Sequence, residues 1–74
     1  MANKTQEVPP SIFILRRPEV EARTGLSRST IYLKVAQGVF PRPVSLGPRA
    51  VGWVASEVEA WLEQQVAASR TNKS

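Results

Sequence analysis

The segment TGLSRSTIYLKVAQG, residues 24 to 38, gathers hydroxyl, guanidinium, phenol and ammonium groups within a short stretch. A guanidinium can donate two hydrogen bonds to guanine, a hydroxyl can pair with several bases, and phenol or ammonium groups can bind phosphate. Arg42 and Arg49 follow before the next acidic residue, Glu57. The candidate contact residues are Ser27, Arg28, Ser29, Thr30, Tyr32, Lys34, Arg42 and Arg49. They either form a solvated, self-capped surface or face an anionic partner.

Several kinds of chemistry are excluded by composition. The 74 residues include no His and no Cys, and the acids are all Glu. Imidazole bases, thiolate nucleophiles and the usual transition-metal ligands are therefore missing. No base is placed beside a nucleophile, so we expect neither an enzyme nor a cofactor.

Charge is distributed unevenly along the chain. The formal net charge is +4, yet no acid occurs between Ala22 and Ser56, where Arg23, Arg28, Lys34, Arg42 and Arg49 all lie. A solvated surface normally mixes both signs, so this segregation favours an anionic partner for the middle of the chain. The alternative is a small basic domain whose charge serves solubility alone.

Two short helices with a tight turn are expected to position these groups. Pro18 suits the first position of a helix over 18–24, and Gly25 suits the left-handed position that ends it. Ser27 then caps a second helix that ends at Gly38. Ile31 and Val35, spaced by four residues, form its inner side. This arrangement is a helix-turn-helix.

The remaining elements are a hairpin and a last helix. Val44 and Leu46 alternate, as do Val51 and Trp53, around a turn at 47–50, and Val44, Leu46 and Trp53 are expected to pack on the helices. In the last helix, Ser56 and Glu59 have the spacing of a capping box. Its apolar side is expected to comprise Val58, Trp61, Leu62 and Val66.

These elements predict a mainly α chain with a small β-hairpin, in the form of a winged helix-turn-helix with a two-stranded wing and a C-terminal helix. The domain is expected over 12–67, between disordered tails at 1–11 and 68–74. No apolar run reaches the roughly 20 residues that a membrane helix needs, and no signal peptide is evident. We expect a cytoplasmic protein without a membrane partner.

In helix-turn-helix proteins, the first residues of the second helix contact base edges in the major groove. This predicts contacts from Arg28, Ser29 and Tyr32, whereas Thr30 either joins them or turns inward as a cap. Lys34 is better placed for phosphate. Arg49, at the hairpin tip, faces either solvent or a minor groove. Arg16 and Arg17 have the same two options, solvent or phosphate.

The motifs TGLSRSTIY, GVFPRPVSLGPRAVGW and SEVEAWL, in this order, resemble the AlpA family of prophage and mobile-element regulators. The resemblance covers Ile14 to Leu62. It implies an excisionase-like protein with a MerR-like winged helix that binds double-stranded DNA through the second helix and the wing. Ser27, Arg28, Ser29, Thr30 and Tyr32 would face the groove, and Arg49 would be the wing contact. Leu33 departs from the family pattern, which often has arginine or another polar residue there.

Three functions are compatible with these features. The first is sequence-specific transcriptional regulation of prophage genes, such as an integrase gene. The second is an excisionase that bends attachment-site DNA beside an integrase. The third is a protein-binding inhibitor that docks through Glu57, Glu59 and Glu63. Because one short helix covers few base pairs, we expect further copies of the chain, or another partner, on adjacent sites.

Overall fold

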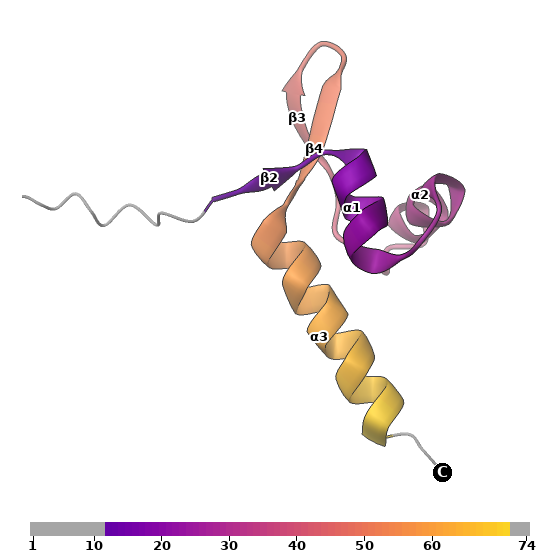
Figure 1. The fold of residues 1–74 in the computed structure, drawn as a ribbon. Helices are drawn as coiled ribbons and strands as arrows, with labels where there is room; N and C mark the ends of the chain where they lie inside the picture. The colour runs from indigo at the N-terminus through magenta and orange to yellow at the C-terminus, as the bar shows by residue number, and fades with distance from the viewer. Residues whose placement is uncertain (1–11, 72–74) are drawn as a thin grey trace, which may run out of the picture.

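The computed structural model describes residues 12–71, which form helices around one small sheet (Figure 1). The elements follow in the order β2 (Ile14–Leu15), α1 (Arg17–Thr24), α2 (Arg28–Ala36), β3 (Val44–Gly47), β4 (Ala50–Val54) and α3 (Ala55–Thr71). This is the expected mainly α fold with a winged helix-turn-helix arrangement. The tail predicted at 1–11 and residues 72–74 lie outside the described residues.

The turn between α1 and α2 forms as the sequence predicts. Gly25 has a φ of 76°, in the left-handed region, and its N–H donates to the Glu21 carbonyl at 2.7 Å. Helix α1 begins at Arg17, one residue before the expected Pro18. Its start is held by Arg16, whose backbone N–H donates to Glu19 Oε1 at 2.8 Å. The acidic side chain thus satisfies a free N–H at the helix end.

The sheet has three antiparallel strands in the order β2-β4-β3, one more than the expected two-stranded hairpin. Strand β2 pairs with the base of β4, Ile14 opposite Val54 and Leu15 opposite Trp53. Gly52 makes this close approach possible: a Cβ there would lie 2.3 Å from Ile14 Cγ2 and 3.1 Å from the Leu15 carbonyl oxygen. The segment before α1 is therefore part of the sheet.

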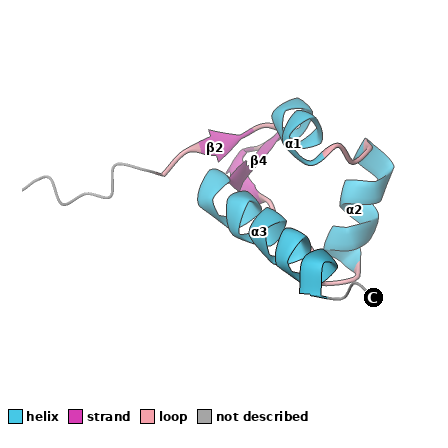
Figure 2. Ribbon diagram, turned by 60° about the horizontal axis from the view of Figure 1, so that its bottom comes forward, coloured by secondary structure: helices cyan, strands magenta, loops and turns pink. Residues whose placement is uncertain are grey.

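One apolar core lies where the elements meet, and it consists of Leu15, Val20, Ile31, Phe40, Trp53 and Val58. Helices α1 and α3 pack on either side of β4, with α2 at the far end (Figure 2). The Trp53 indole N–H donates to the Pro41 carbonyl at 2.9 Å, which fixes the segment before β3. Trp53 is fully buried as expected.

The prediction that Val44 and Leu46 pack on the helices is wrong. Val44 is 37% exposed and Leu46 is 45% exposed, so neither packs on the helices. Leu46 instead lies over Gly52, where its Cδ1 would be 3.2 Å from an added Cβ. Val44, Leu46 and Val51 are each more than a third exposed, so the outer part of the hairpin is open to solvent on both faces.

The start and end of α3 also differ from expectation. Strand β4 continues directly into α3, and the Ala55 N–H donates to the Phe13 carbonyl at 2.8 Å. Among the hydrogen bonds within 12–71, none joins Ser56 to Glu59, so the predicted capping box is wrong. The Glu59 carboxylate instead pairs with Arg23 of α1.

The helix continues to Thr71, so residues 68–71 are helical and the predicted disordered tail is wrong for them. Val66 is 48% exposed and does not belong to the buried side that Val58, Trp61 and Leu62 form. In the part of the chain that the structure describes, no helix is long and apolar enough to cross a bilayer.

Candidate nucleic-acid interface

Helix α2 is anchored at its first turn by its own hydroxyls. Ser27 Oγ accepts a hydrogen bond from the Thr30 N–H at 3.3 Å and donates to Thr30 Oγ1 at 3.0 Å. Thr30 is half-buried, and Ile31 beside it is fully buried in the core. The Thr30 hydroxyl is thus turned toward the capping Ser27, and a contact from Thr30 to DNA stays a prediction. The cap orients α2 and leaves the next two side chains free.

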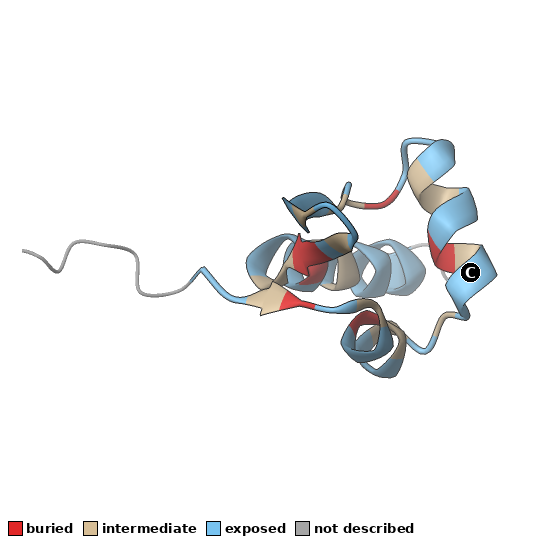
Figure 3. Ribbon diagram, turned by 90° about the horizontal axis from the view of Figure 1, so that it is seen from above, coloured by how far each residue is buried: buried red, intermediate tan, exposed pale blue. Residues whose placement is uncertain are grey.

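Arg28 and Ser29, in this first turn, are both exposed. Much of the α2 ribbon is coloured as exposed (Figure 3). The Arg28 guanidinium carbon lies 6.0 Å from the centre of the Tyr32 ring. The centres of the Tyr32 and Trp53 rings lie 6.0 Å apart, and the planes of the two rings are inclined by 59°. Tyr32 therefore connects the buried tryptophan to the exposed arginine. At an exposed site such a cation–π contact contributes about 0.5–1 kcal/mol, enough to favour one arginine orientation.

The distribution of ion pairs separates the cations into two groups. Arg17 Nε lies 2.9 Å from Glu21 Oε2, and Arg23 pairs with Glu59. In the described region of the chain, no carboxylate pairs with the predicted contact cations Arg28, Lys34, Arg42 and Arg49. The acids of this region lie on α1 and α3. The acids on these two helices therefore do not neutralise the positive charge of α2 and the hairpin by direct pairing.

The other predicted contact residues lie outside the first turn of α2. Lys34 is half-buried in the last turn of α2, and Arg42 is exposed in the segment before β3. Arg49 is exposed at the turn between β3 and β4, and the tip of this hairpin stands clear of the helices (Figure 1). We call this hairpin, residues 44–54, the wing. The structure places all eight predicted residues on or beside α2 and the wing.

Sequence reasoning missed one long-range contact near this surface. Arg16 Nε donates to the Val51 carbonyl at 3.1 Å, which joins the start of α1 to the wing. From the sequence, both Arg16 and Arg17 were expected to face either solvent or phosphate. In the structure, Arg17 instead pairs with Glu21 of its own helix. A bond between residues 35 positions apart has no local signal.

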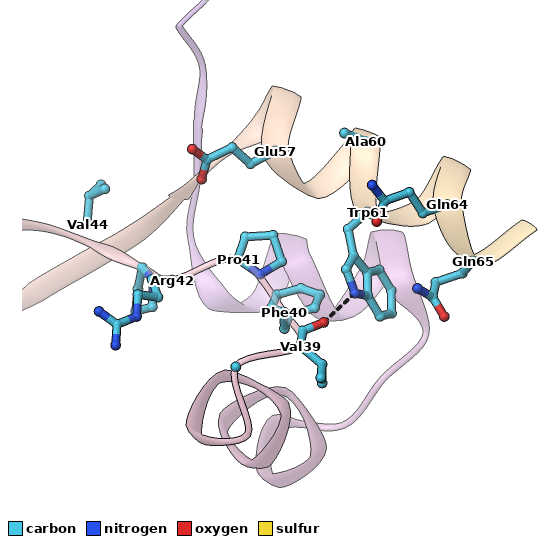
Figure 4. Close-up of a pocket in the computed structure, with 12 residues that line it drawn as sticks. Val39, Phe40, Pro41, Arg42, Val44, Glu57, Ala60, Trp61, Gln64 and Gln65 are labelled. Atoms are coloured by element: carbon cyan, nitrogen blue, oxygen red, sulfur yellow. Dashed lines mark hydrogen bonds between the residues drawn. The ribbon is translucent and has the colours of Figure 1, made fainter. Parts of the chain in front are cut away.

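A groove lies between α3 and the segment that leads to the wing (Figure 4). Its walls include Phe40 and Trp61, whose rings meet edge to face at 4.8 Å, and the Trp61 indole N–H donates to the Val39 carbonyl at 2.7 Å. The Arg42 guanidinium points away from these rings. Within 12–71 no group of acidic side chains is arranged to hold a metal ion. The groove is lined by apolar side chains, such as Phe40 and Trp61, and by polar ones, such as Gln64 and Gln65.

Comparisons with known proteins cover most of this structure. A family model described as Prophage CP4-57 regulatory protein (AlpA) matches residues 13–66, from β2 into α3. The chain is 53% identical over 53 residues to "Uncharacterized protein ORF88" of Enterobacteria phage P4, a match covering 72% of this chain and 60% of that protein. It is 36% identical over 61 residues to the "DNA-binding transcriptional activator AlpA" of Escherichia coli (strain K12), covering 74% and 87%. The chain thus spans less than two thirds of the phage relative.

Proposed function

Because the chain belongs to the AlpA family of prophage regulatory proteins, we propose that it binds double-stranded DNA and regulates transcription of prophage or mobile-element genes. The observation that carries the proposal is the first turn of α2, where Arg28 and Ser29 are exposed and no acid within residues 12–71 pairs with the arginine. The name of the Escherichia coli relative supports the same function. A DNA-binding regulator would act in the bacterial cytoplasm.

Helix α2 has suitable dimensions for the major groove. Its nine residues give a length of about 14 Å at 1.5 Å per residue, against a groove width of about 12 Å. Arg28, at the leading end, would donate two hydrogen bonds to one guanine, and the Ser29 hydroxyl would contact a neighbouring base. The Tyr32 hydroxyl would contact phosphate from the same side of the helix. The base contacts of Arg28 and Ser29 would carry the sequence preference, and the phosphate contact of Tyr32 would help to orient the helix.

The wing would supply the second contact. Arg49 projects from a turn in which Pro48 restricts the backbone, and a narrow minor groove attracts such a side chain through its negative potential. Lys34 and Arg42 would neutralise phosphates on either side of α2. One bound copy would therefore contact the major groove, an adjacent minor groove and the backbone between them.

A selection experiment tests this proposal. Duplexes that the protein retains from a random pool give its preferred site, and mobility-shift titration then compares this site with unselected duplex. We expect Arg28→Ala to weaken binding to the preferred site by about 1–3 kcal/mol. The matched control is Arg70→Ala, which removes an exposed arginine near the end of α3.

The control separates specific contact from bulk charge. We expect Arg70→Ala to bind nearly as tightly as the parent protein. Equal losses in both variants would mean that net charge alone drives binding. If the parent protein retained no duplex from the pool, the proposal would be wrong, and a protein-binding role for the acids of α3 would become the better explanation.

A further inference from the structure

The outer part of the wing has few contacts with the other residues that the structure describes. Strand β2 pairs with β4 only at Trp53 and Val54, so the sheet has two strands beyond this point. The side chains of Val44, Leu46 and Val51 in this outer part are all more than a third exposed. A two-stranded hairpin without a covered face is marginally stable in water. Something else must hold its direction if Arg49 is to reach a defined place on DNA.

The Arg16 side chain connects the outer part of the wing to the start of α1. Its Nε–H donates to the Val51 carbonyl at 3.1 Å, above the base that β2 covers. Among the side-chain hydrogen bonds within 12–71, this is the one that joins another element to residues 44–51. Val51 lies opposite Ser45 in the hairpin, so the bond acts on both strands through their pairing.

The other end of this link is fixed to the helix-turn-helix. The Arg16 backbone N–H donates to Glu19 Oε1 at 2.8 Å, and its carbonyl accepts from the Glu19 and Val20 N–H groups at 2.9 and 3.0 Å. Val20 is fully buried in the core that Ile31 of α2 shares. The base of the Arg16 side chain therefore moves with α1 and α2. Arg17, the next residue, is held by Glu21 and cannot serve in this way.

We propose that Arg16 is a positioning residue that fixes the angle between the wing and α2, so that Arg49 and Arg28 contact one duplex together. The inference rests on the proposed function and assigns a role to a residue that neither base contact nor core packing explains. A wing held in its bound direction loses less conformational freedom when DNA binds. Without this link, Arg49 would still carry its charge, but its contact would be weaker.

The first test needs no DNA. Backbone ¹⁵N order parameters for Gly47, Arg49 and Ala50 report the mobility of the wing tip. We expect order parameters of about 0.85, as in rigid backbone, in the parent protein. In Arg16→Ala we expect them to fall below about 0.6, as in flexible backbone. Arg17→Ala is the matched control, because it removes the same charge from the adjacent residue and should leave the wing rigid. Unchanged order parameters in Arg16→Ala would overturn the proposal.

The second test measures the coupling between Arg16 and Arg49 on DNA. In the parent protein, we expect Arg49→Ala to weaken binding about tenfold, and in the Arg16→Ala protein only about twofold to threefold. In the Arg17→Ala protein the effect should stay near tenfold. Equal effects of Arg49→Ala in all three backgrounds would overturn the proposal.

The two tests separate this inference from the proposed function. If no variant and no parent protein bound duplex DNA, the proposed function would fail, while the order parameters would still decide whether Arg16 fixes the wing. If the wing became mobile in Arg17→Ala as well, loss of charge or of helix stability would be the cause, and the specific role of Arg16 would be refuted.

Discussion

Arg23 and Arg28 lie close together in the chain but have different surroundings. The guanidinium of Arg23 pairs with Glu59 of α3, whereas that of Arg28 lies against the Tyr32 ring, and no carboxylate of the described region pairs with it. A paired arginine would have to exchange one anion for another in order to bind phosphate or base. Arg28 is ready to bind without this exchange. Its environment therefore supports a contact role better than exposure alone would.

This difference leads to a prediction for Arg28→Lys. Lysine keeps the charge but cannot donate the two parallel hydrogen bonds that a guanidinium gives to guanine. We expect the variant to retain its affinity for unselected duplex and to lose about 1–3 kcal/mol of discrimination at one base pair. Titration of duplexes that differ at single positions measures this. Undiminished discrimination at every position would show that Arg28 does not contact a base edge.

Lys34 is expected to behave differently. It lies in the last turn of α2, away from the leading end, and we assign it to phosphate. Lys34→Ala should weaken binding to all duplexes alike and reduce the slope of log K against log salt by about one unit. Binding constants measured over a series of salt concentrations test this. A loss confined to the preferred sequence would instead place Lys34 at a base.

For single residues, the sequence predicted those features that depend on neighbours in the same helix. The Ser27 cap, the buried Ile31 and the exposed Arg28 follow from spacing within one helix. The bonds from Arg16 to Val51 and from Arg23 to Glu59 do not, because each joins positions far apart in the chain. Long arginine side chains can reach several partners, and only the fold decides between them.

Among the elements, the contact between β2 and β4 depends most on a single residue. Gly52 is buried, and a Cβ there would overlap Ile14 Cγ2 and crowd the Leu15 carbonyl. We expect Gly52→Ala to lower the free energy of unfolding by about 1–3 kcal/mol, a typical cost of overpacking. Urea denaturation gives this value. Val51→Ala, at the exposed neighbouring position, should cost less, and equal losses would show that β2 does not depend on Gly52.

Changes at the end of α3 should, in contrast, have little effect on the free energy of unfolding. Residues 63–71 are exposed throughout, so the last turns contribute little to the core. We expect removal of residues 68–74 to change the free energy of unfolding by less than about 0.5 kcal/mol, as for other surface changes. Urea denaturation of the shortened chain measures this. A larger loss would mean that the last turns stabilise the domain in a way that burial does not show.

The sequence predicted both helices of the helix-turn-helix and the hairpin, because glycine, proline and capping serine give local signals at their ends. The apolar run at 12–15 favoured an extended segment on the core but was too short to exclude a helix start. Its pairing with β4 was not predicted, because the partner strand lies far along the chain. The capping box of α3 was wrong for a related reason. The helix starts directly from β4, and the backbone of Phe13 accepts the Ala55 N–H.

At the scale of the whole molecule, charge is divided between two regions. The acids of the described region lie on α1 and α3, where two of them pair with Arg17 and Arg23, whereas α2 and the wing contain none. Sequence order alone showed this segregation. The fold adds that pairing removes Arg23 from the available positive surface. The remaining cations are few, so we expect modest affinity for one copy, with a slope of log K against log salt of about one unit for each phosphate contact.

The size of α2 predicts that several copies or a partner protein share one target. A helix about 14 Å long covers about four base pairs at 3.4 Å each, too few to define one site in a genome. We expect mobility shifts on a duplex with adjacent sites to show several bound species. Nanomolar binding of a single copy to one short site, insensitive to salt, would contradict this prediction.

We propose above that the first turn of α2 contacts base edges in the major groove. Methylation of guanine N7 modifies this groove alone and blocks the acceptor that an arginine would use. Methylation interference on the selected duplex should show that at least one modified guanine prevents binding of the parent protein. The same guanine should lose its effect in Arg28→Ala. If N7 methylation had no effect on binding anywhere in the site, α2 would not contact base edges in the major groove.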